Sequence, residues 1–510
     1  MQRLPWLGRR IASLVFLVSV HVLSLSFAQQ GELRMGMQYD FGTLDPQVLT
    51  TVGDKQMSAN LFDGLVQYEL GTTNIEPDLA TDWTMSDDGL VWTFNLRQGV
   101  QFHKGYGEMT ADDVVFTFER LLSPELSSPN APNHASIASV EALSPYQVRF
   151  TLSEPDPAFL DKLANWFSLI VSKAAVEEKG DRFGDDPIGT GRYQFSHWSP
   201  QQETVFEAFE DHFLGVPNLE RIVFVPIPDA TTMYNAFEAG DVDLIQVTDP
   251  EKLARYESDP SINVYAVPGL VTRFIGLNTE FEPFSDPRVR EAVALAIDRD
   301  SIMEFIFQGI STAADSILAP GVQHVARGVV DYRYDPERAR ELLAEAGYPD
   351  GFDVTLTLPN VDRFTLPAAV VQENLAEVGI RVSLEVMETQ SFVARLRSPE
   401  GLAMFSLSRS QDATPDRVLY SWHHSSAIPE NNWARIRDPE VDAWLDEAIS
   451  TLDENERQRL FGLVQERVAA GHYYYYYDHE NMIFAVRDSV QGFVADPQRS
   501  LRLDDVSMGN

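Results

Sequence analysis

Hydrophobic and polar residues alternate in several short runs, and this pattern predicts half-buried β-strands. In residues 92–97 the large apolar side chains occupy every second position, at Trp92, Phe94 and Leu96. Side chains two residues apart share one face of a strand, so these three would pack against the same layer. The same alternation recurs in residues 148–152, 353–358 and 380–386.

Helices are marked by their start and stop signals. Thr110 precedes an apolar run, so residues 111–122 are predicted to form a helix. An N-cap aspartate followed by a proline in the first turn occurs three times, at Asp286-Pro287, Asp335-Pro336 and Asp438-Pro439. Glycines stand where C-terminal caps belong, at Gly347 and Gly379. Strands and helices alternate along the chain, which indicates the α/β class.

The first 28 residues have the pattern of an export signal. Arg3, Arg9 and Arg10 form a positive region, and residues 11–27 are mostly apolar. Small residues then occupy the −3 and −1 positions of a cleavage site in Ser26-Phe27-Ala28. We therefore expect cleavage after Ala28. The alternative is a membrane anchor, but the apolar run is short and interrupted by polar residues.

The composition of the chain excludes several classes of partner and several kinds of chemical site. The chain has no cysteine, which excludes disulfides, thiolate metal sites, a cysteine nucleophile and a lipid-modified cysteine. An exported protein of this kind is expected to diffuse freely in a bacterial periplasm. The formal charge of −38 argues against nucleic acid or an anionic membrane surface as partner, because both would be repelled. The length of 510 residues predicts two or three domains.

The common catalytic signals are absent from the sequence. There is no G-x-S-x-G elbow, no H-E-x-x-H pair and no G-x-x-x-x-G-K-[ST] loop. The acidic pairs Asp112-Asp113 and Asp185-Asp186 are better explained as helix caps than as general acid and base. His423 and His424 are adjacent in the sequence. Because adjacent residues of a strand point to opposite faces, we do not expect these two histidines to bind one metal ion together. We predict no catalytic residue, no metal site and no cofactor.

The most specific pattern lies between Asn60 and Arg120. It reads ANLFDGLVQYEL and then EPDLATDWTMSDDGLVWTFNLRQGVQFHKGYGEMTADDVVFTFER. This arrangement resembles the family 5 extracellular solute-binding proteins, in which the segment matching Glu76 to Phe102 is part of the identifying pattern. A second familiar element of that family is Phe237-Glu-Ala-Gly-Asp-Val-Asp, a helix that leads directly into a strand. The resemblance covers nearly the whole mature chain.

The resemblance implies an α/β fold of the type II periplasmic binding proteins, cluster C-like. Two lobes would be joined by hinge strands, and an extra domain would be inserted. Carried over to this sequence, domain I comprises residues 29–65, 187–269 and 481–510. Domain II is the insertion, residues 66–186, and domain III spans residues 270–480.

The resemblance also implies a function. Members of the family capture a solute between domains I and III and deliver it to the permease subunits of an ABC importer in the inner membrane. We expect a monomeric periplasmic receptor for a peptide or peptide-like solute, with no enzymatic activity. The same fold could instead bind an oligosaccharide, an opine or a metal chelate. Two other classes remain open, a secreted hydrolase and a chaperone-like protein that holds unfolded chains.

The peptide binders of the family hold the α-ammonium of the ligand with an aspartate in domain III. Asp412 is the matching candidate here, although the spacing to Pro415 is one residue shorter than in oligopeptide binders. Asp412 could instead cap its own loop. Arg409 could contact a ligand carboxylate, or form an internal salt bridge with Asp412 or Asp416.

Other candidates come from segments that border the cleft in the family. Tyr39 and Asp40 precede the Leu44-Asp-Pro loop, and Thr272 precedes the predicted crossing Phe274-Ile-Gly-Leu-Asn. No acidic residue follows that loop until Asp54, which weakens an oligopeptide assignment. Possible walls of the pocket are Trp166, Trp422 and Trp433.

The run Tyr473 to Tyr477 is unusual. On a strand its rings would alternate between two faces. Two interpretations are open: the rings pack in the core of a covered sheet, or some of them form a stacking surface for a ligand.

Overall fold

The computed structural model describes residues 31–498 and 500–509. The predicted export signal, residues 1–28, lies outside the described residues, as do the first two residues of predicted domain I. Within the described part of the chain no helix is both long and apolar enough to span a bilayer.

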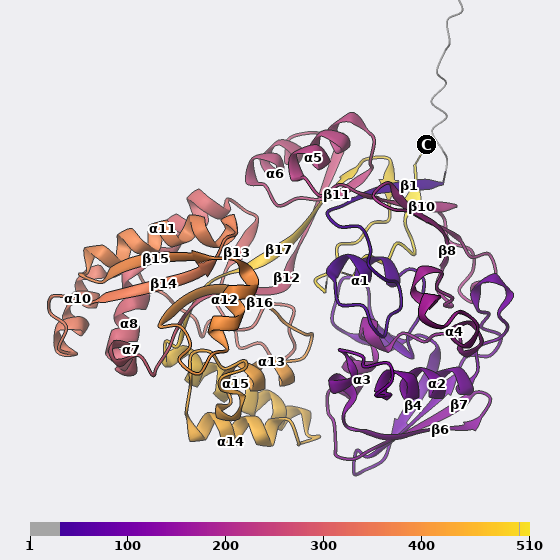
Figure 1. Ribbon diagram of the computed structural model, residues 1–510, viewed down its shortest axis with the longest axis horizontal. Helices are drawn as coiled ribbons and strands as arrows, with labels where there is room; N and C mark the ends of the chain where they lie inside the picture. Colours follow the sequence, from indigo (N-terminus) through magenta and orange to yellow (C-terminus); the bar gives the residue numbers. More distant parts are fainter. Residues whose placement is uncertain (1–30, 499, 510) are drawn as a thin grey trace, which may run out of the picture. The chain divides into compact units, whose positions relative to one another are not determined.

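A mixed sheet with eleven strands in the described residues forms the framework (Figure 1). Its order is β15 (Arg381–Met387), β14 (Asp353–Pro359), β16 (Met404–Ser410), β12 (Ile262–Leu277), β17 (Tyr474–Arg487), β11 (Leu244–Gln246), β1 (Glu32–Met37), β10 (Arg221–Pro226), β9 (Glu203–Ala208) and β8 (Tyr193–Ser199), with β13 (Ser311–Ala313) paired to β17. The alternating runs predicted at residues 353–358 and 380–386 are β14 and β15, which lie side by side in parallel register.

The strands β12 and β17 are long and pair antiparallel from Ile262 opposite Arg487 to Gly276 opposite Tyr474. At one end β12 also pairs with β16, and at the other end β17 also pairs with β11. Figure 1 shows the two strands crossing from one half of the sheet to the other. The register shifts near Thr272 and Arg273, so the crossing contains irregularities that relax strict pairing. These are the two hinge-like crossings expected from the sequence.

A second sheet has the order β4 (Ala80–Met85), β5 (Val91–Leu96), β7 (Gln147–Leu152) and β6 (Ile137–Ser144). The predicted alternation is confirmed in β5, where Trp92, Phe94 and Leu96 are buried. The helix α2 spans Ala111–Leu122 as predicted, and Thr110 with Asp113 forms a capping box at its start. Phe118 of α2 packs edge-on against Phe150 of β7, which joins the helix to the sheet.

The three Asp-Pro pairs begin helices as predicted. They open α8 (Pro287–Ala296), α10 (Pro336–Glu345) and α14 (Pro439–Ala448), and each aspartate accepts a hydrogen bond from a backbone N–H of the first turn. Gly347 follows α10, and Gly379 follows α11 (Asp362–Glu377). Both glycines have positive φ, which only glycine adopts without strain. The helix α11 contains Pro367, an interruption that the sequence pattern did not predict.

The tyrosine run lies in the core. Tyr474 and Tyr476 pack in one hydrophobic cluster, and Tyr475 and Tyr477 pack in another on the opposite face of β17. All four are almost completely buried. The core interpretation is therefore confirmed, because helices cover both faces of this part of the sheet.

The described residues form further helices and strands, of which α15 is the longest helix. They are α1 (Val52–Ser58), α3 (Phe159–Leu163), α4 (Lys173–Lys179), α5 (Ala230–Ala239), α6 (Pro250–Glu257), α7 (Glu282–Ser285), α9 (Arg299–Ile302), α12 (Thr389–Leu396), α13 (Asp416–His423), α15 (Glu454–Ala470), β2 (Val66–Tyr68), β3 (Ile75–Pro77), β18 (Val490–Gln491) and β19 (Ser507–Met508).

Candidate ligand-binding site

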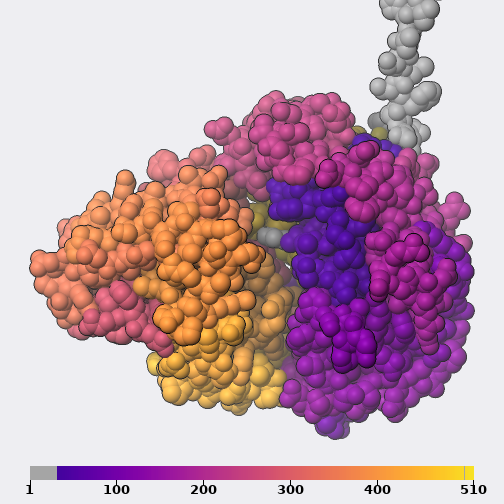
Figure 2. All heavy atoms as spheres, in the orientation of Figure 1, coloured from indigo at the N-terminus to yellow at the C-terminus, as the bar shows by residue number. Residues whose placement is uncertain are grey.

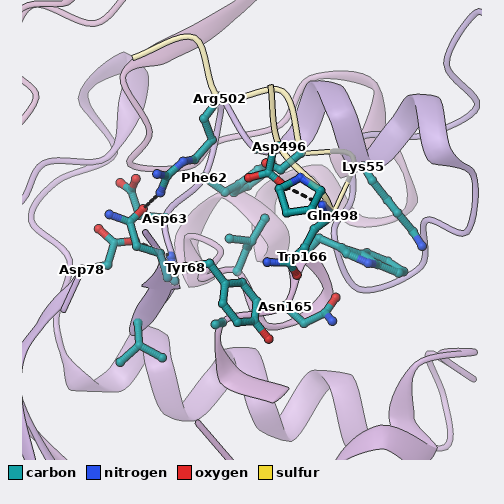
Figure 3. Close-up of a pocket in the computed structure, with 18 of the residues that line it drawn as sticks. Lys55, Phe62, Asp63, Tyr68, Asp78, Asn165, Trp166, Asp496, Gln498 and Arg502 are labelled. Carbon is teal, nitrogen blue, oxygen red and sulfur yellow. Dashed lines mark hydrogen bonds between the residues drawn. The ribbon is translucent and has the colours of Figure 1, made fainter. Parts of the chain in front are cut away.

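A cavity of about 270 Å³ lies among segments that are far apart in the sequence. Its wall is formed by α1 and the turn that follows it, by β2, by residues 164–169, by the loop after β16, and by residues 496–498 and 500–504 (Figure 3). A second cavity of about 240 Å³ adjoins the first, because both are lined by Val52, Val271 and Ser410. The space-filling view shows the surface hollowed between the indigo N-terminal segment and the orange segment that contains β16 (Figure 2).

The turn after α1 fixes the C-terminal segment in this wall. The side chain of Asn60 donates a hydrogen bond to the carbonyl of Leu501 at 2.7 Å and accepts one from the N–H of Leu503 at 3.0 Å. Asn60 is buried, so both of its contacts are protected from water. One residue of the motif Asn60-Leu-Phe-Asp-Gly thereby holds residues 500–504 beside the cavity.

Asp412 and Trp166, two of the predicted site residues, line the first cavity. Asp412 lies on the loop between β16 and α13, and its side chain is 31% exposed. It accepts two hydrogen bonds from Arg417, at 2.6 Å from Nε and 2.8 Å from Nη2. The loop therefore presents a carboxylate and a guanidinium together.

The ammonium group of Lys55 makes a cation–π contact with the ring of Trp166, and its Nζ lies 3.9 Å from the ring centroid. Figure 3 shows Trp166 and Lys55 on one side of the cavity, with Tyr68 and Asn165 beside them. Sequence reasoning missed Lys55, Tyr68 and Asn165. Their positions depend on how α1, β2 and residues 164–169 meet, and no local pattern signals that meeting.

Arg409, Trp422 and Trp433 are not brought to either cavity. They lie on the other face of β16, where the Arg409 guanidinium stands 3.4 Å from the Trp433 ring centroid and 4.8 Å from that of Trp422. Arg409 donates to the carbonyl of Asn431 at 2.5 Å. Burial lowers the pKa of Arg409, and the two rings supply the contact that a counter-ion would otherwise make.

The predicted internal salt bridge of Arg409 is wrong. Asp412 pairs with Arg417, and Asp416 accepts hydrogen bonds from Arg457 at 2.7 and 2.8 Å. Asp412 lies on the loop after β16 and Asp416 begins α13, and each of them has an arginine other than Arg409 as its partner.

Tyr39 lines the second cavity and is 60% exposed. Asp40 instead accepts hydrogen bonds from Trp198 Nε1 at 3.0 Å and from the N–H of Gln201 at 2.8 Å, so it fixes a neighbouring loop. Thr272 is fully buried, and its hydroxyl contacts His479 Nδ1 at 2.9 Å and accepts from Gln411 at 2.7 Å. Thr272 thus supports Gln411, which itself lines the first cavity.

The inner end of the first cavity is strongly charged. Among the charged groups of its wall are the carboxylates of Asp63, Asp78 and Asp504 and the guanidiniums of Arg192 and Arg502. Asp63 accepts from the hydroxyl of Thr190 at 2.7 Å, and Asp78 accepts from the N–H of Gly64 at 3.0 Å. Burial, and then the neighbouring Asp63, raise the pKa of Asp78 well above its usual value. Within the described residues, no group of three or more histidine, aspartate or glutamate side chains is arranged to hold a metal.

Residues 74–432 match the family described as bacterial extracellular solute-binding proteins, family 5. Heme-binding protein A of Haemophilus influenzae is 33% identical over 466 residues, which cover 86% of this chain and 85% of that protein. The dipeptide-binding protein of Escherichia coli K12 is 28% identical, with 98% of each chain covered. The solved structure of DppA from Helicobacter pylori in complex with the peptide STSA superposes with a TM-score of 0.78 at 30% identity, and the match covers 94% of this chain and 98% of that one.

These similarities extend well beyond the segment from Asn60 to Arg120, and they confirm the expected fold class as that of the type II periplasmic binding proteins. The long paired strands β12 and β17 and the inserted four-stranded sheet are consistent with that architecture. The chain belongs to family 5 of the bacterial extracellular solute-binding proteins, which are substrate-binding proteins of transporters.

Proposed function

We propose that this protein captures a short peptide or peptide-like solute in the first cavity and delivers it to the permease of an ABC importer. It acts as a monomer in the periplasm and makes no covalent change to the solute. The observation that carries the proposal is the position of Asp412. Its half-buried carboxylate faces the cavity from the loop after β16, the region where peptide binders of the family place the aspartate that holds an α-ammonium.

The lining of the cavity fits a small ligand with charged ends. A volume of about 270 Å³ is at the lower limit of clefts that enclose drug-sized ligands, so the cavity suits a short peptide. Aromatic rings at Tyr68 and Trp166 supply apolar surface, and Asn165 and Gln498 supply amide groups for the peptide backbone. Each hydrogen bond to the ligand must replace one that the ligand made with water, and these amides can do so.

The names of the relatives support a peptide more than the other solutes considered from the sequence. One relative is a dipeptide-binding protein, and one similar structure holds a tetrapeptide. The chain has no cysteine to which a lipid could be attached, and this supports free diffusion in the periplasm.

The proposal is tested by calorimetric titration with di- to pentapeptides. At least one peptide should bind in a 1:1 ratio, and Asp412→Ala should weaken its binding roughly 10- to 100-fold, because a charge-assisted hydrogen bond is lost. The melting transition of the variant should be retained, since the Asp412–Arg417 pair is partly exposed and such pairs contribute little to stability.

A change in the ligand distinguishes the α-ammonium from other contacts. Acetylating the N-terminus of the peptide should weaken binding to the unmodified protein, and should weaken binding to Asp412→Ala much less. Asp87→Asn, on an exposed turn between β4 and β5, serves as a control that should bind normally. Peptides that cause no heat and no thermal shift, or peptides that are cleaved, would overturn the proposal.

A further inference from the structure

The wall of the first cavity combines two segments that the sequence assigns to different domains. Tyr68 belongs to the domain II segment, residues 66–186, and Asp412 belongs to the domain III segment, residues 270–480. Figure 3 shows the side chain of Tyr68 within the cavity. The long strands β12 and β17 can act as a hinge, so the separation of these two segments decides whether the cavity is open or closed.

Asp161 and Gln323 connect the two segments next to the cavity. Asp161 Oδ1 accepts from the Tyr68 hydroxyl at 3.2 Å and also from Gln323 Nε2 at 3.1 Å. The backbone N–H of Gln323 donates at 2.7 Å to the carbonyl of Ala413, the residue after Asp412. A continuous series of hydrogen bonds therefore runs from Tyr68 to the loop that carries Asp412. Neither Asp161 nor Gln323 lines either cavity, so each acts on a ligand only through its neighbours.

Two further contacts join the same segments. The Thr73 hydroxyl donates to the carbonyl of Gly321 at 2.9 Å. Leu452, between α14 and α15, lies against Gly89 in the turn between β4 and β5, where an added Cβ would stand 2.6 Å from Leu452 Cδ1. Glycine permits this close approach because it has no side chain to collide with the leucine. Gly89 and Leu452 do not line the first cavity, so the contact between the segments extends beyond the ligand site.

The hydrophobic clusters of the described residues do not continue from one segment into the other. The cluster that contains buried side chains of the domain II segment includes none of the domain III segment, and the two clusters of the domain III segment include none of the domain II segment. The contact thus consists of hydrogen bonds and single side chains rather than a shared core. Such a contact can separate at low cost, because its polar groups exchange their partners for water.

We propose that the domain II segment closes against the domain III segment when the protein retains its solute, and that Asp161 and Gln323 are the positioning residues of this closure. The inference rests on the proposed function and adds a part of the chain to it, because capture was expected between domains I and III. Asp161 orients Tyr68, and Gln323 connects Asp161 to the Asp412 loop. Loss of this contact lowers the population of the binding-competent state and weakens the apparent affinity in proportion.

The first test removes a residue of the closure without changing the lining of the cavity. In titrations with di- to pentapeptides, Gln323→Ala should bind roughly 3- to 10-fold more weakly than the parent protein, because one hydrogen bond of the closed state is lost. The dissociation rate should rise more than the association rate falls. Leu452→Ala, at the other contact, should weaken binding in the same direction. The control is Gln372→Ala, a half-buried glutamine that donates to Val382 within the domain III segment, and its affinity should stay at the parent value.

A distance measurement detects the closure directly and needs no ligand. The chain has no cysteine, so spin labels can be attached at Glu119→Cys in α2 and Glu373→Cys in α11, two exposed positions. In the ligand-free protein, Gln323→Ala and Leu452→Ala should shift the distribution of label distances toward longer separations. Gln372→Ala should leave the distribution unchanged.

Parent-like affinity and parent-like distances in both Gln323→Ala and Leu452→Ala would overturn the closure. Weaker binding with unchanged distances would also overturn it, since the residue would then act on the site in another way. The two variants lie at separate contacts, so a folding defect in one leaves the other as a test. If no peptide binds, the proposed function fails, while the ligand-free distances still decide whether the two segments close.

Discussion

The ion pair Arg273–Asp478 connects the side chains of the two crossing strands β12 and β17. Arg273 lies on β12 and Asp478 lies on β17, opposite each other beside a shift of register. Arg273 Nε stands 2.9 Å from Asp478 Oδ1, and the two side chains are 3% and 0% exposed. The guanidinium also lies 4.2 Å from the ring centroid of Phe307. Both charges are removed from water, so each depends on the other for compensation.

Replacing Asp478 by Asn should therefore destabilise the protein strongly. The change leaves the Arg273 guanidinium buried without a counter-ion, which costs about 3–5 kcal/mol in comparable sites. The free energy of unfolding in urea would measure the loss. The matched control is Asp353→Asn, which breaks an exposed pair with Arg381 and should cost at most about 1 kcal/mol. Equal losses in the two variants would show that the buried pair has no special role.

At the same scale, the candidate residues Asp412 and Trp166 line the first cavity, whereas Arg409 does not. Asp412 follows a strand that resembles a family segment. Its position in a loop could be predicted from where that strand ends. Arg409 is three residues earlier in β16. Its side chain lies on the face of this strand that is directed away from the cavity. That choice depends on the neighbours of β16 in the sheet, which local alternation cannot reveal. The inner acids Asp63 and Asp78 lie within recognised motifs, but their convergence is a contact between turns.

Secondary-structure elements were predicted best where their signals are local. The cap of α2 and the three Asp-Pro helix starts depend on side chains within three residues of the helix end, so the sequence contains the whole interaction. The segment after β17 is different. Residues 496–498 and 500–504 have little regular structure, and Asn60 contacts Leu501 and Leu503 of this segment, more than 400 residues away in the chain. No periodic pattern marks such a segment.

The cap of α8 offers a direct measurement at this scale. Asp286 accepts from the N–H of Arg288, and Asp286→Ala should lower the free energy of unfolding by about 1 kcal/mol, because an N–H of the first turn loses its acceptor. Asp286→Asn keeps a capping oxygen and should be close to the parent protein, although it loses the exposed ion pair with Arg288. If the Asn and Ala variants lost equal stability in urea, the cap would not be the cause.

On the scale of the whole molecule, a few polar contacts join segments that the sequence assigns to different domains. Asp161, at the start of α3 in predicted domain II, accepts from Tyr68 at 3.2 Å and from Gln323 of predicted domain III at 3.1 Å. Thr73 donates to the carbonyl of Gly321 nearby, at 2.9 Å. The charged pair Asp416–Arg457 lies close enough to influence Asp161. The domain boundaries themselves stay a prediction, and these contacts show where the two segments meet.

The buried carboxyl group of Asp161 should make the stability of the protein depend on pH. Burial, and then the charge of Asp416, raise the pKa of Asp161 to about 7, whereas an aspartate in an unfolded chain has a pKa of about 3.9. The folded state thus holds this proton more tightly, so the stabilisation is complete below the unfolded pKa and disappears as the pH rises through about 7. Between pH 5 and 8 the parent protein should lose about 2 kcal/mol more than Asp161→Asn, in urea unfolding at each pH. Other buried acids, such as Asp496 with a pKa raised to about 6, act alike in both proteins and cancel in the comparison. Identical pH profiles would show that Asp161 does not titrate in this range.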